Sequence, residues 1–140
     1  MLDDVLAAKA AIIERCVARV REEYAAAANF KTDYTHQDAA LLNLQRACEA
    51  TIDMAQRMVR LRNLGLPQTA RDNFALLTDA KLIDADLADR LGRMTGFRNI
   101  AIHDYRTLDL ALVEDVIRNK LGDLLAFSKQ MLVLGGAHAG

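Results

Sequence analysis

The sequence has few residues that interrupt helices, since it contains one proline and seven glycines in 140 positions. A β-sandwich needs many turns rich in these two residues, so that architecture is excluded. No apolar run approaches the roughly 18 residues that a membrane-spanning helix requires. Neither sign of charge dominates, because the formal net charge is −1. This balance excludes a nucleic-acid binder that relies on a basic tail, but it allows a local basic patch.

Cysteine is also scarce. Cys16 and Cys48 both lie in apolar helical patterns, and neither has a second cysteine or a histidine at metal-ligand spacing. We expect two small buried core residues, with a reactive thiol or a disulfide as the alternative. The first ten residues, MLDDVLAAKA, are acidic and contain no signal-peptide core. These absences predict a cytoplasmic protein without a membrane segment.

The chain does have a globular composition, with 52% hydrophobic and 26% charged residues. Its apolar positions recur with the period of a helix, and no segment alternates with period two. Leu6, Ile13 and Val20 place a first helix over about residues 2–28. A second helix is expected from an N-cap at Thr35 to a C-cap at Gly65. Its apolar positions are Leu41, Leu44, Cys48, Ile52, Ala55 and Val59.

Three further helices are expected in the second half of the chain. They run from a Thr69–Asp72 capping box to about residue 78, from an N-cap at Asp84 to about residue 96, and from Thr107 or Asp109 to about Leu134. The apolar side of the last is Leu112, Val116, Leu121, Leu124, Leu125 and Ser128. The prediction is a single all-α domain over 1–134, an up-and-down bundle of about five helices, with a flexible tail at 135–140.

One segment is dense in functional groups, namely FRNIAIHDYR at 97–106. From Arg90 to Arg106 there are four arginines and one aspartate, a local charge of about +3, which suits phosphate. On an ideal helix Arg98 and His103 would point roughly 140° apart. Either the helix breaks here or these side chains meet groups of a second subunit, as in a symmetric dimer. A structural polar loop is the alternative.

The spacing Arg98-x4-His103-x-Tyr105 resembles the RX4HXY signature of the HEPN superfamily, small all-α proteins that include many RNA-cutting toxins. The segments LNLQRACEATIDMA, LGLPQTARDNFALL and FRNIAIHDY, followed by a long C-terminal helix, are similar to the HepT family. The resemblance covers nearly the whole chain.

This resemblance implies a homodimeric, metal-independent endoribonuclease without a cofactor, the toxin of a type VII HepT/MntA-like toxin–antitoxin pair. Arg98 and His103 would then cut RNA, either tRNA or mRNA. The implied partner is an MntA-like nucleotidyltransferase that neutralises the toxin by adenylylating Tyr105, although Tyr24 and Tyr34 are alternative acceptors. The competing hypothesis is a non-catalytic dimeric partner or substrate of such a transferase, and a purely structural helical scaffold is a third.

The residue types suit metal-free RNA cleavage, in which the 2′-OH attacks the adjacent phosphate. Histidine is the natural base near neutral pH, and arginine offers fixed paired donors to the phosphate. Because this region of one chain holds a single histidine, a second His103 from a dimer would supply the general acid. Arg93 and Arg106 are expected to contact RNA phosphates. For Asn99 the alternatives are to hold a phosphate oxygen, to orient Arg98 or to cap a helix. Asp104 would orient an imidazole or balance Arg106.

Other polar residues are expected to be structural. His36 should be solvent-exposed in the first turn of the second helix, and His138 should lie in the tail. Glu49 and Asp53 are four residues apart on the second helix. A charged helix face or a dimer rim explains this pair better than a metal site does.

Overall fold

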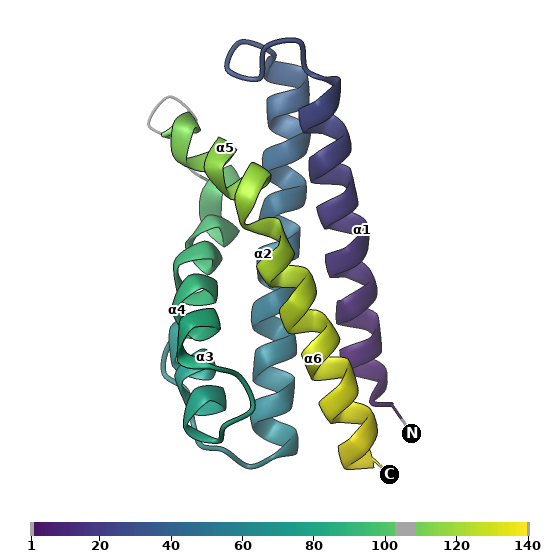
Figure 1. Cartoon of the computed structure of the whole chain (residues 1–140), viewed down its shortest axis with the longest axis vertical. Coiled ribbons are helices and arrows are strands. Elements are labelled where there is room, and N and C mark those ends of the chain that lie inside the picture. The colour runs from purple at the N-terminus through teal and green to yellow at the C-terminus, as the bar shows by residue number, and fades with distance from the viewer. Residues whose placement is uncertain (1, 103–108, 140) are drawn as a thin grey trace.

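The computed structural model describes residues 2–102 and 109–139, and every regular element in these ranges is helical (Figure 1). The all-α prediction is therefore confirmed. The elements are α1 (Asp4–Ala26), α2 (Tyr34–Leu61), α3 (Ala70–Asp79), α4 (Ala85–Met94), the 3-10 helix η1 (Thr95–Ile102), α5 (Leu110–Asn119) and α6 (Leu121–Ala139). None of the described helices is both long enough and apolar enough to cross a membrane.

The two long helices α1 and α2 form an antiparallel hairpin, against which the other helices pack (Figure 1). The helix α2 is central, because it contacts α1, α3, η1 and α6. The helix α6 packs across both long helices, and the shorter α3 and α4 pack against each other beside α2. The 3-10 helix η1 is thereby held against α2.

Side-chain oxygens cap the starts of five helices, as helix N-termini require. Thr69 and Asp72 form the predicted box in full, and Asp84 accepts the backbone N–H of Leu87 at 2.7 Å. The cap of α2 is Asp33 rather than Thr35, because its carboxylate accepts the N–H of His36 at 3.1 Å. The helix therefore begins one residue before the predicted cap.

The end of α2 also differs from the expected glycine cap. Asn63 adopts the left-handed conformation with φ 52°. Its N–H donates to the Arg60 carbonyl at 3.2 Å, and the next N–H, that of Leu64, donates to the Val59 carbonyl at 3.0 Å. This is a Schellman motif, for which asparagine is an accepted residue. Gly65, with φ 135°, lies in the loop beyond it.

The predicted closing helix is two helices that bend at Lys120. Both helices pack on the core, where Val116 of α5 and Leu124 of α6 are buried. The helix α6 then continues to Ala139, past its expected end near Leu134. A Cβ atom at Gly135 would lie 2.5 Å from Leu6 Cδ1, so this glycine allows α6 to approach α1 closely.

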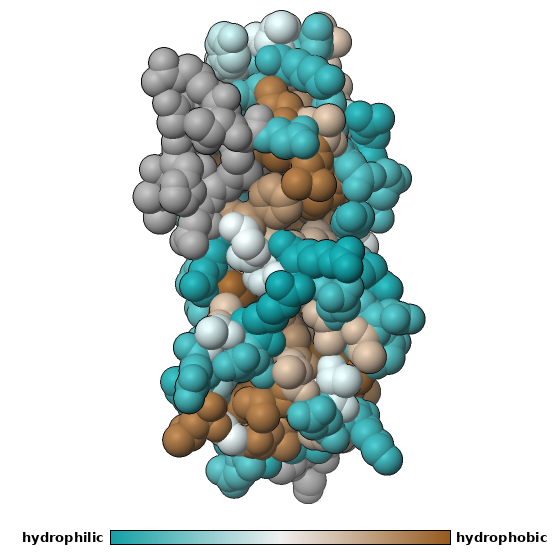
Figure 2. Space-filling view, turned by 90° about the vertical axis from the view of Figure 1, so that its left-hand side faces the viewer, coloured by the Kyte–Doolittle hydropathy of each residue, from teal (hydrophilic) through white to brown (hydrophobic). Residues whose placement is uncertain are grey.

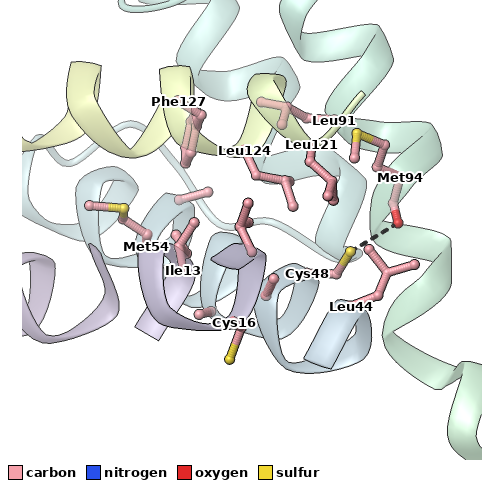
Figure 3. Close-up of a cluster of buried hydrophobic side chains, with 14 of the residues drawn as sticks. Ile13, Cys16, Leu44, Cys48, Met54, Leu91, Met94, Leu121, Leu124 and Phe127 are labelled. Atoms are coloured by element: carbon pink, nitrogen blue, oxygen red, sulfur yellow. Dashed lines mark hydrogen bonds between the residues drawn. The ribbon is translucent and has the colours of Figure 1, made fainter. Parts of the chain in front are cut away.

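The core lies between the hairpin, α6 and the α3–α4 pair. Phe74 of α3 and Phe127 of α6 pack edge to face with ring centroids 5.7 Å apart. Figure 3 shows buried side chains of α1, α2, α4 and α6 in this core, among them Ile13, Met54, Leu91 and Phe127. Every apolar position predicted for α2 is buried: Leu41, Leu44, Cys48, Ile52, Ala55 and Val59.

Candidate functional site

The segment that carries the signature begins where α4 changes into η1. The predicted fourth helix ends at Met94, and the chain continues as a 3-10 helix from Thr95 to Ile102. The Thr95 hydroxyl donates to the Gly92 carbonyl oxygen at 3.0 Å and so closes the last turn of α4. Short 3-10 stretches commonly end α-helices. Because a 3-10 helix has about 3.0 residues per turn rather than about 3.6, Arg98 leaves the chain in a different direction from the one that a continued α4 would give it.

A buried thiol attaches this junction to the central helix. The Cys48 thiol of α2 donates to the Met94 carbonyl oxygen, with 3.3 Å between sulfur and oxygen (Figure 3). Burial raises the pKa of Cys48 to about 12, so the thiol stays protonated and remains a donor. The prediction that Cys16 and Cys48 are buried is confirmed, since their exposures are 2% and 0%.

The structure places part of the predicted site. Arg98 is half-buried on η1, and Asn99 follows it on the same helix. Arg93 is exposed in the last turn of α4, where its guanidinium pairs with Asp89 at 3.0 Å. The remaining predicted site residues, His103, Asp104, Tyr105 and Arg106, lie outside the described residues. Their predicted roles stay predictions.

Phe97, the residue before Arg98 on η1, helps to line a pocket of about 240 Å3, which we call the α4–α5 pocket. Three helices and the α5–α6 junction form it. Its lining residues are Arg90, Arg93, Met94, Phe97, Leu112, Val116 and Lys120. Sequence reasoning missed this pocket, because Leu112 falls on the predicted apolar side of the closing helix, yet it is 49% exposed.

The rim of the α4–α5 pocket is cationic, and each cation has a carboxylate neighbour. Arg90 pairs with Asp123 at 3.1 Å, in addition to the Arg93–Asp89 pair. Lys120 pairs with Asp115 at 3.3 Å, and the pKa of Asp115 is lowered by hydrogen bonds from Asn119 and then Lys120. Solvent-exposed pairs of this kind contribute little stability. The rim cations can therefore exchange their partners for a phosphate at small cost.

A polar contact ties α5 to α1 on the far side of α5. The Tyr24 hydroxyl donates to Glu114 at 3.1 Å, and the Arg118 guanidinium lies 6.0 Å from the ring centroid. Burial, followed by this bond to Glu114, raises the pKa of Tyr24. Tyr34, the other alternative acceptor, is 70% exposed. Of these two tyrosines, Tyr34 is the more accessible to a modifying enzyme.

Two predictions about histidine need correction. His36 is half-buried rather than exposed, because its Nδ1 lies 2.6 Å from a carboxylate oxygen of Glu23. This hydrogen bond raises the pKa of His36 and lowers that of Glu23. His138 lies within the last turn of α6 rather than in a tail. The pair of His36 and Glu23 could not be predicted from the sequence. Its residues are 13 positions apart on two different helices, and they meet only because the α1–α2 turn brings the helices together.

The acidic pair on α2 has a partner in the hairpin. Asp53 lies 3.0 Å from Lys9 of α1, so it forms an ion pair between the two long helices. Within residues 2–102 and 109–139, no three histidine, cysteine or acidic side chains gather as metal ligands.

The helical fold and the signature on and after η1 define a HEPN-type protein. Residues 13–131 match the model of a family described as Ribonuclease HepT-like, and the chain belongs to this family.

The relatives with known names support the same assignment. The mRNA nuclease HepT of Shewanella oneidensis is 44% identical over 126 residues, which are 90% of this chain and 95% of that protein. A solved structure of a tri-AMPylated Shewanella oneidensis HEPN toxin in complex with an MNT antitoxin is 43% identical with a TM-score of 0.86, over 93% of this chain and 98% of that one. A toxin–antitoxin structure with AMP-PNP has a TM-score of 0.87 and 43% identity, over 92% and 98% of the two chains. The resemblance identified from the sequence is confirmed.

Proposed function

We propose that this chain is the toxin of a HepT/MntA-like toxin–antitoxin pair, a metal-independent endoribonuclease acting on RNA in the cytoplasm. One observation carries the proposal. Arg98, His103 and Tyr105 keep the complete signature in a chain 44% identical to a protein named mRNA nuclease HepT. Two features support it: Arg98 is half-buried on η1, and its sequence neighbour Phe97 lines a pocket with a cationic rim.

The proposed reaction is internal transesterification. His103 removes the proton of the 2′-OH, whose oxygen then attacks the adjacent phosphorus. The bond from phosphorus to the 5′-oxygen breaks, that oxygen takes up a proton, and a 2′,3′-cyclic phosphate remains. Arg98 donates paired N–H groups to the phosphate oxygens, which gain negative charge in the transition state.

The acid for the leaving oxygen comes from a second copy of the chain in this proposal. A two-fold dimer would bring two copies of His103 to one site, one as base and one as acid. A heterodimer with a single His103→Ala chain tests this division of roles. We expect a large loss of cleavage, and full activity would contradict shared catalysis.

The proposed regulation is adenylylation of Tyr105 by an MntA-like nucleotidyltransferase. The modification adds bulk and one negative charge two residues from His103, and both oppose the entry of an RNA phosphate. The related complex of a tri-AMPylated toxin with an MNT antitoxin supports this partner and this chemistry. We expect stoichiometrically adenylylated protein to lose cleavage, and Tyr105→Phe protein to escape silencing. Cleavage that persists after complete modification would refute the switch.

The deciding experiment is cleavage of total RNA by the purified full chain in EDTA, compared with Arg98→Ala and His103→Ala proteins. Arg21→Ala, which removes an exposed arginine of α1, is the matched control. We expect cleavage by wild type and by the control, and at least a hundredfold loss in both signature variants, the scale on which positioned charge and acid–base groups act. Absence of cleavage by protein whose mass shows no modification would favour the non-catalytic binding partner.

A further inference from the structure

We propose that the α4–α5 pocket is a nucleobase subsite. It receives one base of a single strand against the ring of Phe97, while Arg93 and Lys120 hold the phosphate attached to that nucleotide. The inference deepens the proposed function, since it rests on that function for the identity of the strand as RNA.

The first argument is the exposure of Phe97. Phe30, Phe74 and Phe127 are at most 5% exposed. Phe97 alone among the four phenylalanines is half-buried, and it packs against the core and also lines the pocket. A partly exposed aromatic ring in a hollow is the usual platform on which unpaired bases stack.

The walls of the pocket suit a flat ring. Met94 and Val116 are buried and close its floor, with exposures of 2% each, whereas Leu112 is 49% exposed. A base placed here would cover apolar surface of Phe97 and Leu112 that otherwise faces water. Figure 2, which views the side carrying α4 and α5, shows apolar surface at the height of α5 with hydrophilic surface near it.

The second argument is charge complementarity. Three cations, Arg90, Arg93 and Lys120, line this pocket, whereas their carboxylate partners are not among its lining residues. A larger hollow of about 500 Å3 on α6, which we call the α6 hollow, is also mainly apolar, but among the residues that the structure describes Lys129 is its one charged lining residue. Apolar surface alone therefore does not separate the two hollows. The three cations distinguish the α4–α5 pocket, because they suit a ligand that carries an anion next to a flat apolar group. A nucleotide, with its phosphate and its base, is such a ligand.

The third argument is position. Phe97 directly precedes Arg98 on η1. The two side chains leave the 3-10 helix about 120° apart, so if Arg98 holds the phosphate that is cut, a base on Phe97 belongs to a nucleotide within about one or two positions of the cleaved bond. The pocket would then influence the sequence at which the strand is cut.

Binding of single-stranded oligonucleotides tests the subsite without cleavage. Fully 2′-deoxy strands lack the attacking hydroxyl, and a single abasic site is moved through them one position at a time. For the wild-type chain we expect one position at which loss of the base weakens binding about 5- to 150-fold, the range that stacking of one base gives. In Phe97→Leu, which keeps an apolar side chain without a ring, we expect that positional effect to disappear.

Val133→Ala in the α6 hollow is the matched control, because Val133 is 66% exposed and lines that hollow, whereas it is not among the residues that line the α4–α5 pocket. It should keep the wild-type abasic profile. Circular dichroism and thermal unfolding establish that Phe97→Leu is folded. An abasic profile that is flat in wild type, or equal in wild type and Phe97→Leu, would overturn the subsite.

Mapping of cleavage sites on total RNA gives the second readout. We expect Phe97→Leu to cut RNA with a relaxed base preference at one position beside the cleaved bond, and Val133→Ala to keep the wild-type preference. Unchanged preference in Phe97→Leu would overturn the subsite while the proposed nuclease stands. If the wild type cuts no RNA but shows the abasic effect, the subsite stands and the proposed nuclease fails.

Discussion

Two regions of this bundle use phenylalanine in opposite ways. Where α3 meets α6, Phe74 and Phe127 are 1% and 0% exposed, and their rings contact each other edge to face. Where η1 meets α5, Phe97 is half-buried and is one of the residues that line a pocket. The first pair has no free surface, so its effect is confined to folding. The second ring contributes less to packing and has surface to offer a ligand.

The leucines repeat this contrast along the two closing helices. Leu124 of α6 is fully buried, whereas Leu112 of α5 is 49% exposed beside Phe97. Both lie on the apolar side predicted from one continuous helix. Substitutions in the two regions should therefore separate stability from recognition.

The largest expected effect is on folding. Phe127→Ala should lower the free energy of unfolding by about 3–5 kcal/mol, because it removes a fully buried ring and leaves a cavity. Phe97→Ala should cost less than half as much, since its ring is already partly in water. Urea unfolding of both proteins measures the difference. Equal losses would mean that Phe97 is a packing residue and would erase the contrast.

A smaller effect is expected on the salt dependence of strand binding. Removing one cation that neutralises a phosphate should reduce the slope of log K against log salt by about 0.7 for a single strand. Arg93→Ala and Lys120→Ala should each show this reduction with little change in stability, because their ion pairs are exposed. Lys129→Ala, in the α6 hollow, is the control. An unchanged slope in Arg93→Ala and Lys120→Ala would mean that neither residue contacts a phosphate of the strand.

The smallest expected effect is on the pH dependence of stability, and it concerns the His36–Glu23 pair at the α1–α2 turn. The pKa of His36 is raised in the folded chain. The stability that protonated His36 contributes is therefore fully present below the unfolded pKa of 6.5, and it is lost as pH rises through the folded pKa. The lowered pKa of Glu23 adds stability above 4.5 that is lost as pH falls. His36→Gln should therefore lower Tm more at about pH 5.5 than at about pH 9.

Thr35→Ala, an exposed neighbour, should show no such dependence. A Tm difference for His36→Gln that stays constant with pH would mean that the ion pair adds nothing to the hydrogen bond.

Local signals predicted the elements well and their junctions less well. The caps at Thr69 and Asp84 were predictable, because a cap depends on residues three apart. The end of α2 was misplaced because Gly65 gave the stronger local signal, although Asn63 makes the turn. The bend at Lys120 was missed because the apolar pattern continues through it. Such a bend depends on which neighbours each half packs against.

The candidate site divides in the same way. The signature is a contiguous sequence pattern, so Arg98, His103 and Tyr105 could be named without a structure. The α4–α5 pocket joins Arg90 of α4 to Leu112 and Lys120 near α5, and no spacing rule links residues that far apart. The contact between Tyr24 and Glu114 could not be predicted for the same reason, because these residues are 90 positions apart.

The Cys48 thiol gives the protein a native reporter of local opening. A thiol with a pKa of about 12 and no exposure reacts with a disulfide reagent only when its surroundings open. Its bond to the Met94 carbonyl makes that opening a separation of α2 from the α4–η1 junction. Cys16, buried in the α1–α2 hairpin, offers a second reaction on the same chain. The ratio of the two labelling rates would show whether the site end opens alone or only with the whole bundle.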